Sequence, residues 1–353
     1  MKKEILNKII DDLHVDGILL YSSQNRYWFS RFYSSLGYIL YTKQKSYLFV
    51  DGRYITAAKN NSLLTNIDEI ISFGSIFELI NEKLGHHKIK KLLFEADWVV
   101  VNQAQILKNK LDTEIIAHNF DSIRMIKDEW EIKQIKKACD ITHQVFLEVL
   151  DFIKPGMNEI QIAHFVNNSF LKNGAERLSF NTIVASGVNG SMPHAVPSSK
   201  IINKGEFITL DTGCYYNGYA SDQTRTFALG DNNEQLKEIY EIVYQAQQKG
   251  IEAIKPGITG KAIHKICFDY INSKGYGQYF THGTGHGLGI EIHEEPYNSA
   301  NGDKILEPGM CVTVEPGIYI PNLGGVRIED DILVTKDGYE FLTTPLRDLQ
   351  VVK

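Results

Sequence analysis

Residues 210–226 have the sequence LDTGCYYNGYASDQTRT, which places two carboxylates, Asp211 and Asp222, on either side of an aromatic, glycine-containing turn. Strand-prone residues flank that turn, so the stretch predicts one hairpin with both carboxylates facing the same cleft. Two like charges in a partly buried site are unfavourable unless a cation lies between them, and a divalent metal is the usual one. The alternative on this stretch alone is an exposed hairpin whose Asp side chains cap the turn.

The same construction returns about 100 residues later in the chain. The segment FITLDTG, which contains Asp211, is echoed by CVTVEPG, which contains Glu315. Glu329 follows the second turn as Asp222 follows the first. Each copy therefore contributes a hairpin with two carboxylates.

The repeat extends upstream of both hairpins. The tetrapeptide IKPG occurs at residues 153–156 and again at residues 254–257, and each copy precedes a helical stretch. His194 in the sequence HAVP likewise pairs with His293 in the sequence HEEP. Two copies predict an internal duplication of one helix-plus-strands unit, whose pseudo-two-fold axis would bring both hairpins and both histidines to one cleft.

Composition limits the class of protein. A chain of 353 residues with 43% hydrophobic and 23% charged residues predicts a globular protein of two domains. A net charge of -6 and a pI near 6.0 argue against nucleic acid as a partner, and no apolar run is long enough for a membrane span. The first residues lack the apolar core of a signal peptide, and the four cysteines lack metal-binding spacing. We therefore expect a cytoplasmic protein with reduced, buried thiols.

The first 120 or so residues alternate helical and strand patterns, which is typical of an α/β domain. We expect helices near residues 3–13, 53–59, 76–84 and 102–111, and strands near residues 17–21, 38–41, 47–50, 69–73 and 91–95. The aromatic residues from Tyr27 to Tyr33 are expected to pack within a loop. A polar link follows, and Asp128 with Glu131 forms a capping-box pattern that opens a long helix. The predicted domains are therefore residues 1–122 and 123–353.

The second predicted domain also contains a segment rich in glycine and histidine, THGTGHGLG at residues 281–289. His282 and His286 lie in this segment and His293 follows it, so several imidazoles lie along one short stretch. The glycines allow a close approach of the backbone to a neighbouring group. A phosphate-binding loop is the competing interpretation, but no Lys follows the glycines and no helix is predicted to start there.

The duplicated hairpins and the histidine segment together resemble a known family. Five residues match, in order and in sequence surroundings, the ligand set of the pita-bread metallopeptidases: Asp211, Asp222, His286, Glu315 and Glu329. Over essentially the whole chain, the layout is similar to that of the Xaa-Pro dipeptidases (prolidases) and aminopeptidases P. The resemblance implies an α/β creatinase-like N-terminal domain followed by an α+β pita-bread catalytic domain with an internal pseudo-two-fold duplication.

Two related groups match less well. Simple methionine aminopeptidases share the five ligands but lack such an N-terminal domain, and they lack the Arg that is here Arg327, two residues before the last ligand. Creatinases keep the fold but lose the metal ligands. The resemblance therefore favours a peptidase that acts on Xaa-Pro bonds.

The resemblance also implies a dinuclear metal centre. Asp211 and Glu329 would bridge two divalent ions, Asp222 would bind one ion, and His286 with Glu315 would bind the other. Mn²⁺ is favoured, and Co²⁺, Zn²⁺ or Fe²⁺ also suits four carboxylates with one imidazole. A water between the ions would be the nucleophile, the ions would polarise the scissile carbonyl, and Glu315 would take up and pass on the proton.

Four further residues receive roles from the resemblance. His194 and His293 would flank the bound peptide and hydrogen-bond its carbonyl or carboxylate, with His282 close by. Arg327 would support the ligand Asp211 and also Tyr319. All four are therefore candidate catalytic residues, and the first two also bind substrate.

The favoured function is dinuclear-metal-dependent hydrolysis of the Xaa-Pro bond in dipeptides, with short proline-containing peptides as partners. The span between Glu315 and Glu329 is short, which resembles prolidases more than aminopeptidases P. An Xaa-Pro aminopeptidase acting on longer peptides is the alternative among enzymes, and a non-catalytic peptide-binding module is the alternative of another class. A homodimer is expected, and Trp28 of a neighbouring subunit is a candidate to close the cleft.

Overall fold

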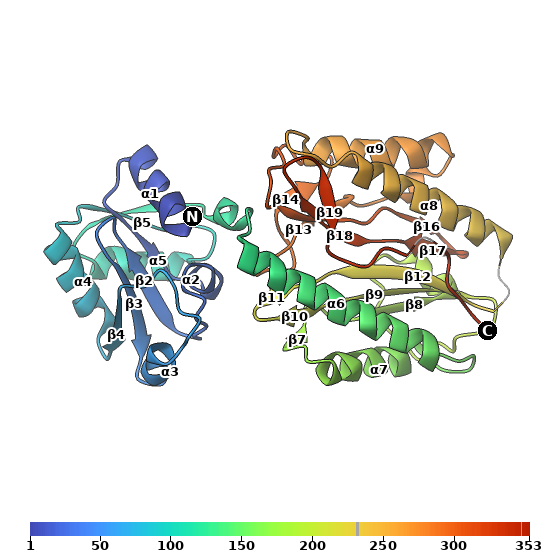
Figure 1. The fold of residues 1–353 in the computed structure, drawn as a ribbon, viewed down its shortest axis with the longest axis horizontal. Helices are drawn as coiled ribbons and strands as arrows, with labels where there is room; N and C mark the ends of the chain where they lie inside the picture. The colour runs from blue at the N-terminus through green and yellow to red at the C-terminus, as the bar shows by residue number, and fades with distance from the viewer. Residues whose placement is uncertain (231–232, 347) are drawn as a thin grey trace. The chain divides into compact units, whose positions relative to one another are not determined.

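The computed structural model describes residues 1–230, 233–346 and 348–353, which separate into two compact units, Met1–Ile123 and Arg124–Lys353 (Figure 1). The division falls in the polar link that precedes the long helix. None of the helices in the described residues combines the length and the apolar character that a membrane span requires.

The N-terminal unit is a six-stranded sheet with helices between its strands. The strand order is β4-β3-β2-β1-β5-β6, in which β2 pairs antiparallel with β1 and β3 and the other neighbours are parallel. The strands are β1 Gly17–Leu20, β2 Gly37–Tyr41, β3 Ser46–Asp51, β4 Glu69–Phe73, β5 Lys91–Glu95 and β6 Glu114–His118. The helices are α1 Lys2–Leu13, α2 Ser23–Ser30, α3 Ile55–Lys59, α4 Ile76–His87 and α5 Val101–Lys110. The expected α/β pattern is present, and β6 is a strand that the sequence did not reveal.

Helix α2 corrects two expectations about the aromatic cluster. Tyr27, Trp28 and Phe29 lie in this helix rather than in a loop. Aromatic residues are only moderate helix formers, so the local signal is weak, and the helix depends on its Ser22 cap, which accepts a hydrogen bond from the backbone N–H of Asn25 at 3.0 Å. Trp28 is only 1% exposed, so it is packed inside its own domain and does not close the cleft of a neighbouring subunit.

The second unit contains two pairs of helices. They are α6 Glu129–Phe152, α7 Glu159–Lys172, α8 Glu234–Glu252 and α9 Gly260–Ser273. Short 3₁₀ turns in this unit are η2 Gly187–Ser191 and η3 Gly277–Tyr279, and the turn η1 Asp121–Arg124 spans the division between the units. Figure 1 shows α6 and α7 along one flank of the strands and α8 and α9 along the other. The predicted capping box at the start of α6 is confirmed, because Asp128 accepts from the N–H of Glu131 and the Glu131 side chain accepts from the N–H of Asp128.

The strands of this unit form two main sheets. The first has the order β20-β12-β9-β8 and the second the order β14-β13-β15-β18-β19, with small sheets β11-β10-β7 and β16-β17 beside them. The strands of the first half are β7 Arg177–Leu178, β8 Ile183–Ser186, β9 Phe207–Thr212, β10 Cys214–Tyr216, β11 Tyr219–Ala220 and β12 Gln223–Leu229. Those that follow are β13 Gly285–Gly287, β14 Glu294–Asn298, β15 Cys311–Val314, β16 Gly317–Ile320, β17 Gly324–Arg327, β18 Asp330–Val334, β19 Tyr339–Phe341 and β20 Val351–Val352.

The predicted duplication is visible in the strand pairing. Strand β9 pairs antiparallel with β12, and the hairpin β10–β11 lies between them in sequence. Strand β15 pairs antiparallel with β18, with the hairpin β16–β17 between them. Each copy also has an isolated bridge at the start of its helix, Asn158 with Ile201 and Thr259 with Ile305.

Two hydrophobic cores hold the halves together, one per helix pair. Val166 of α7 packs with Leu210 and Phe227 in the first core, and Val314 and Ile332 belong to the second, which includes α8 and α9. Each fully buried side chain of this size stabilises the fold by about 1.5–3 kcal/mol. The four cysteines are free and buried, as expected.

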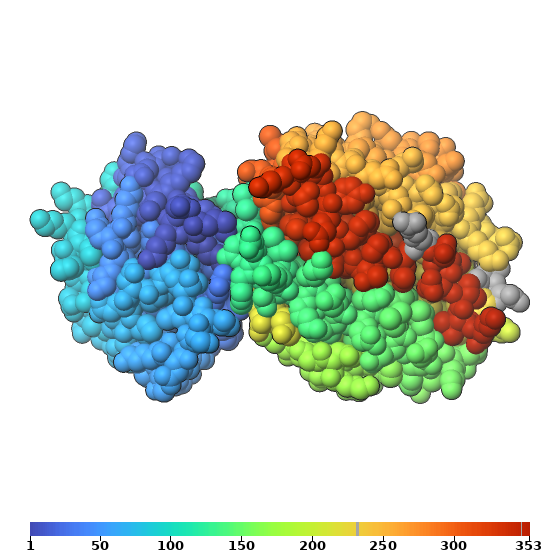
Figure 2. Space-filling view, in the orientation of Figure 1, coloured from blue at the N-terminus to red at the C-terminus, as the bar shows by residue number. Residues whose placement is uncertain are grey.

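A C-terminal strand contacts helix α6 through an ion pair at the surface. In Figure 2 the red C-terminal segment lies beside the green helix α6. Lys136 Nζ of α6 lies 2.9 Å from Glu340 Oε1 of β19, and both side chains are about half exposed. An exposed ion pair of this kind contributes at most about 1 kcal/mol.

Candidate metal centre

The first hairpin carries two predicted ligands into the interior. Asp211 lies on β9, and Asp222 lies directly before β12. Asp211 Oδ2 accepts a hydrogen bond from Arg327 Nη2 at 2.7 Å, whereas its Oδ1 has no hydrogen-bond partner among the described residues. The backbone N–H of Asp222 donates to Asp331 Oδ2 at 3.0 Å, which fixes the entry to β12.

The second half contributes the other three predicted ligands. His286 lies on β13, Glu315 directly follows β15, and Glu329 lies between β17 and β18. His286 Nε2 lies 3.3 Å from Glu315 Oε1 and 3.6 Å from Asp222 Oδ2. Glu329 Oε2 accepts a hydrogen bond from Thr224 Oγ1 at 2.7 Å, and no residue that the structure describes donates to its Oε1. Side chains from both halves of the duplication therefore converge.

Burial, together with mutual repulsion, raises the pKa of three of the converging carboxylates. Burial, followed by the charges of Glu329 and Asp211, raises the pKa of Asp222 well above its usual range. Burial and the charges of Glu315 and Asp211 have the same effect on the pKa of Glu329. Burial also raises the pKa of Asp211, against the opposing charge of Arg327. A cation placed among these groups would remove the repulsion that adds to the effect of burial.

Glu315 and His286 form an ion pair within this cluster. Burial opposes ionisation of Glu315, but the hydrogen bond and charge of His286, with smaller effects of His282 and Arg327, lower its pKa to about 2. The pKa of His286 is raised because the hydrogen bond and charge of Glu315 outweigh the burial that acts against protonation. Metal binding requires a neutral imidazole, so an ion that binds here displaces the proton of His286.

The donor set fits a divalent metal. Asp222, His286 and Glu329 offer ligand atoms that all lie within 4.8 Å of one another. Asp211 Oδ1 and Glu329 Oε1 are buried oxygens without a donor among the described residues, and a buried carboxylate oxygen is costly without a partner. Carboxylates with a single imidazole suit hard or borderline divalent ions.

A chain of hydrogen bonds runs along one side of the ligands. His282 Nε2 lies 2.8 Å from the Tyr319 hydroxyl oxygen, to which Arg327 Nη1 donates at 2.8 Å. The other terminal nitrogen of Arg327 holds Asp211. The structure thus brings Arg327 to the ligand that it was expected to support, and it connects His282 to the same network through Tyr319.

The two histidines of the repeat are held in different ways. The His293 ring packs edge-on against the His286 ring, with 4.2 Å between the centroids, and burial together with the charge of His286 lowers the pKa of His293. The His194 side chain is exposed, and it makes no hydrogen bond, ion pair or ring contact with any residue in the described part of the chain. Both nevertheless line the same cavity as the ligands.

That cavity has a volume of about 560 Å³ and brings together all nine predicted site residues. Residues 180–183 and 193–197 form one wall, and Tyr297 and Ser299 contribute to another part of the lining. Among the described lining residues, Arg327 alone carries a permanent positive charge, and it is engaged by Asp211 and Tyr319. The rest of the lining offers imidazoles, carboxylates and neutral groups.

Three residues that hydrogen-bond the predicted ligands were not predicted from the sequence: Thr224, Thr313 and Asp331. Thr313 Oγ1 donates to Glu315 Oε1 at 3.1 Å, and Thr224 bonds the last ligand of the set. Asp331 orders the backbone at Asp222, and burial raises its pKa to about 7. Thr224 is two residues after Asp222, and Thr313 is two residues before Glu315. Residues two apart in extended chain share a face, so this spacing could have indicated both threonines from the sequence.

The fold and the site define a metal-dependent hydrolase whose catalytic unit is an internal duplication that follows an α/β domain. Residues 133–336 match the model of metallopeptidase family M24, and residues 3–126 match the creatinase/prolidase N-terminal domain. The chain belongs to metallopeptidase family M24. The expected fold class, a creatinase-like domain followed by a pita-bread catalytic domain, is confirmed.

Relatives extend over the whole chain. It is 42% identical to the Xaa-Pro dipeptidase from Bacillus anthracis, whose structure superposes with a TM-score of 0.94 over 99% of both chains. It is 39% identical to the Xaa-Pro dipeptidase of Pyrococcus furiosus over 98% of both chains. It is 40% identical to a putative Xaa-Pro aminopeptidase of Mycoplasma genitalium, over 97% of this chain and 96% of the relative. Dipeptidases and an aminopeptidase are thus about equally similar.

Proposed function

We propose that this chain is a dinuclear metallopeptidase that hydrolyses the Xaa-Pro bond of dipeptides. The observation that carries the proposal is the convergence of four carboxylates and one imidazole on a cavity also lined by His194 and His293. Similarity over the full length to the Xaa-Pro dipeptidases of Pyrococcus furiosus and Bacillus anthracis supports the substrate class.

Five residues would hold the metal ions in this proposal: Asp211, Asp222, His286, Glu315 and Glu329. Two divalent ions, when bound, supply Lewis acidity toward a peptide carbonyl and toward water. Asp211 and Glu329 each keep one carboxylate oxygen free of donors from the described residues, and each therefore has an oxygen available for a ligand bond. We favour Mn²⁺ because oxygen ligands dominate the set, with Co²⁺, Zn²⁺ and Fe²⁺ as the other candidates.

Glu315 would move the proton during hydrolysis. Its carboxylate lies in the cavity, with Thr313 Oγ1 donating to Oε1 at 3.1 Å. An ionised carboxylate within reach of the reacting atoms accepts a proton from the attacking group and returns it to the leaving amine.

His194 and His293 would orient the peptide. Burial lowers the pKa of His293 below its ordinary value, which favours the neutral imidazole with one donor and one acceptor. A neutral donor aimed at a carbonyl oxygen stabilises the negative charge that develops there during hydrolysis. His282, which is tied to Tyr319, would support this side of the cavity.

An Xaa-Pro aminopeptidase is the second candidate, and one observation favours it. A dipeptide presents a free carboxylate next to the proline ring, and Arg327, the permanent cation in the described lining, already bonds Asp211 and Tyr319. A longer peptide has an amide at that position and needs no cation. The dipeptidase proposal requires His194 or His293 to bind the carboxylate instead.

A comparison of three peptides tests the proposal. We expect kcat/KM for Ala-Pro to exceed that for Ala-Pro-Ala, because discrimination is a ratio of these constants. Faster cleavage of Ala-Pro-Ala by the manganese-loaded enzyme assigns the chain to the aminopeptidases. Preference for Met-Ala-Ser overturns specificity for Xaa-Pro bonds.

We also propose that the protein acts as a cytoplasmic homodimer. Free, buried thiols at all four cysteines agree with a reducing compartment. Light scattering coupled to gel filtration tests the oligomer, since each chain has a mass of 40.0 kDa. A particle with the mass of one chain at micromolar concentration contradicts the dimer.

A further inference from the structure

The position of His194 is set by the backbone that carries it. His194 lies within residues 187–198, here called the His194 segment, which follows β8 and begins with the 3₁₀ turn η2. Five of its residues line the cavity, Pro193 to Pro197. The His194 ring has no bond or ring contact with the described residues, so nothing at the side chain itself fixes it. Whatever holds the segment therefore aims the imidazole.

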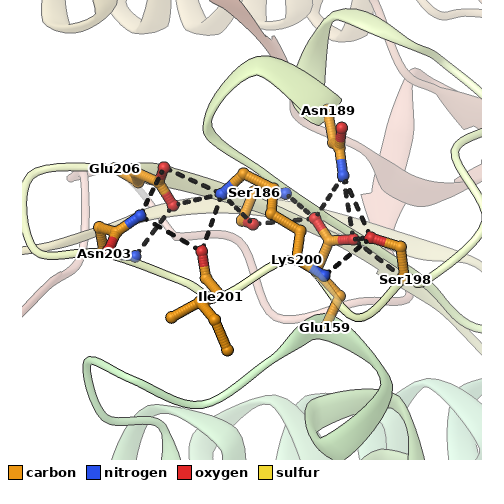
Figure 3. Close-up of polar contacts among 8 residues, drawn as sticks. All are labelled: Glu159, Ser186, Asn189, Ser198, Lys200, Ile201, Asn203 and Glu206. Carbon is orange, nitrogen blue, oxygen red and sulfur yellow. Dashed lines mark hydrogen bonds and ion pairs between the residues drawn. The ribbon is translucent and has the colours of Figure 1, made fainter.

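A buried carboxylate, Glu159, holds both ends of the His194 segment (Figure 3). Its Oε1 accepts hydrogen bonds from the backbone N–H and the hydroxyl of Ser186, both at 2.8 Å. Its Oε2 accepts from the backbone N–H of Ser198 at 3.0 Å and from the Ser198 hydroxyl at 2.7 Å. Asn189 Nδ2 lies 3.1 Å from each oxygen. One side chain therefore joins the residue before the segment, its first turn and its last residue.

The charge of Glu159 is well compensated although the residue is fully buried. Glu159 is the first residue of α7, where the backbone N–H groups favour a negative charge. Lys200 Nζ donates to the Ser186 hydroxyl at 3.0 Å, and it also pairs with Glu206 Oε2 at 2.7 Å. Figure 3 shows Lys200 and Glu206 next to the contacts between Glu159 and Ser186. Hydrogen bonds to an ionised acceptor are about twice as strong as neutral ones.

The middle of the segment is held from the metal side. Arg327 Nη1 donates to the carbonyl oxygen of Pro193, the residue before His194, at 3.2 Å. The same guanidinium bonds the ligand Asp211. The segment is thus held on the metal side by Arg327, at Glu159, and through the buried Ala195, which packs with Ile183 and Ala185 of β8. The Glu159 anchor lies outside the cavity.

We propose that Glu159 is a positioning residue that holds His194 in place for catalysis. The inference rests on the proposed function, because it requires His194 to contact the peptide. A carboxylate is needed at this position, since each oxygen accepts three hydrogen bonds, and an amide nitrogen at either place would face a backbone N–H and the Asn189 Nδ2 group, neither of which can accept. Neutral glutamine has nearly the same shape, but it would lose the backbone hydrogen bond to Ser186 or to Ser198, at one end of the segment.

The variant Glu159→Gln tests the proposal in the manganese-loaded full chain, with the better of Ala-Pro and Ala-Pro-Ala as substrate. We expect kcat/KM to fall about 10- to 100-fold, since small displacements of a positioned group cost up to that factor. Metal content per chain should remain that of the wild type, because Glu159 contacts none of the five ligands. An unchanged kcat/KM overturns the proposal.

A double-mutant cycle separates positioning of His194 from a general loss of structure. In the His194→Ala background, Glu159→Gln should change kcat/KM by less than about twofold, because its effect passes through the missing imidazole. Additive losses in the double variant contradict the inference. If His194→Ala alone has no effect, the proposed function of His194 fails, and the result is distinct from a failure at Glu159.

A matched control comes from the N-terminal unit. Glu95 is also fully buried, and its carboxylate accepts from the N–H and hydroxyl of Ser22 at the start of α2. Glu95→Gln should destabilise the chain comparably yet leave kcat/KM within about twofold of the wild type. If Glu159→Gln fails to fold, the milder variant Asn189→Ala replaces it in the test. It removes only the contact between Asn189 and Glu159, and it should still lower kcat/KM through its effect on His194 alone. An Asn189→Ala effect that persists without His194 overturns the inference.

Discussion

The two halves of the catalytic unit follow the same chain path but fix it by different means. Helix α7 begins at Glu159 and helix α9 at Gly260, and the two N–H groups donate to equivalent carbonyls, Lys200 at 3.3 Å and Lys304 at 3.4 Å. In the first half a side chain bridges the space to the following segment. In the second half the backbone at Gly260 packs directly against the backbone of Tyr297. The two lie so close that a Cβ added at Gly260 would be 2.1 Å from the carbonyl oxygen of Tyr297.

The histidines of the two halves differ in the same sense. His293 packs against His286, and the neighbouring Glu294 is clamped by Lys127 Nζ at 2.7 Å. The His194 ring has no such packing, and Glu159 bonds both ends of the segment that carries it, whose middle is held by Arg327 and by the buried Ala195. A duplicated fold can thus place equivalent groups at one cavity through direct packing in one copy and through polar bridging in the other. The polar bridge is the more sensitive to single substitutions, because one buried charge supports several contacts.

The largest effect should come from removing one ligand from each half. Asp211→Asn and Glu329→Ala should each lower hydrolysis by more than about 100-fold, since even outer partners of metal ligands cost 10- to 100-fold. Both halves should be equally intolerant, because both residues face the same cluster. Peptide assays with metal analysis measure this, and circular dichroism checks the fold. Full activity in the presence of chelator contradicts a metal-dependent mechanism.

The next effect concerns the two histidines. His194→Ala and His293→Ala should each reduce kcat by about 100-fold or more while the metals are retained, because each would lose a donor to the reacting peptide. Metal content measured together with the rate shows whether each histidine acts on the peptide or supports the metal centre. If His293→Ala loses metal in proportion to activity, its packing against His286 matters more than any contact with the peptide.

The metal ligands of both halves could be predicted from the sequence, but two of the residues that hold them and the His194 segment, Asp331 and Glu159, could not. The ligands are visible because Asp211 and Glu315 recur in matching surroundings. Glu159 is not visible as an anchor, since its partners Ser186 and Ser198 lie 27 and 39 residues away and their meeting depends on the tertiary fold. Asp331 escaped for the same reason, because its bond to the N–H of Asp222 spans 109 residues.

The fold was similarly predictable where the signal is local. The Asp128 capping box and the alternating strands of the N-terminal unit follow from short-range patterns. Helix α2 lacks such a pattern: it is eight residues long, and Lys2 Nζ from α1 bonds the carbonyl oxygen of Trp28 within it. Isolated helices of that length are unstable, so tertiary contacts decide the outcome.

A smaller effect, on stability, should distinguish the two helix starts. Gly260→Ala should lower the free energy of unfolding by about 1–3 kcal/mol, because its Cβ meets the backbone of Tyr297, which has little room to move. Gly85→Ala is the control, since that glycine lies in α4 with open space around it and Ala is the better helix former. Urea unfolding compares the two variants. A stable Gly260→Ala protein contradicts direct backbone packing in the second half.

The smallest expected difference lies in the caps of the same two helices. Asn158 caps α7 in a full capping box, in which its Oδ1 accepts from the N–H of Gln161 at 2.9 Å and the Gln161 side chain bonds back at 2.9 Å. Thr259 caps α9 through one hydrogen bond of 3.2 Å, from the N–H of Ala262. Loss of a cap costs about 0.5–2 kcal/mol. Asn158→Ala leaves the N–H of Gln161 without its side-chain acceptor, so it should fall in the upper part of that range, whereas the N–H of Ala262 also bonds the carbonyl oxygen of Thr259 at 3.0 Å. Thr259→Ala should fall in the lower part, because direct backbone packing continues to hold the start of α9. Urea unfolding of both variants measures the difference, and an equal or larger loss for Thr259→Ala would show that the second half also depends on its polar contacts.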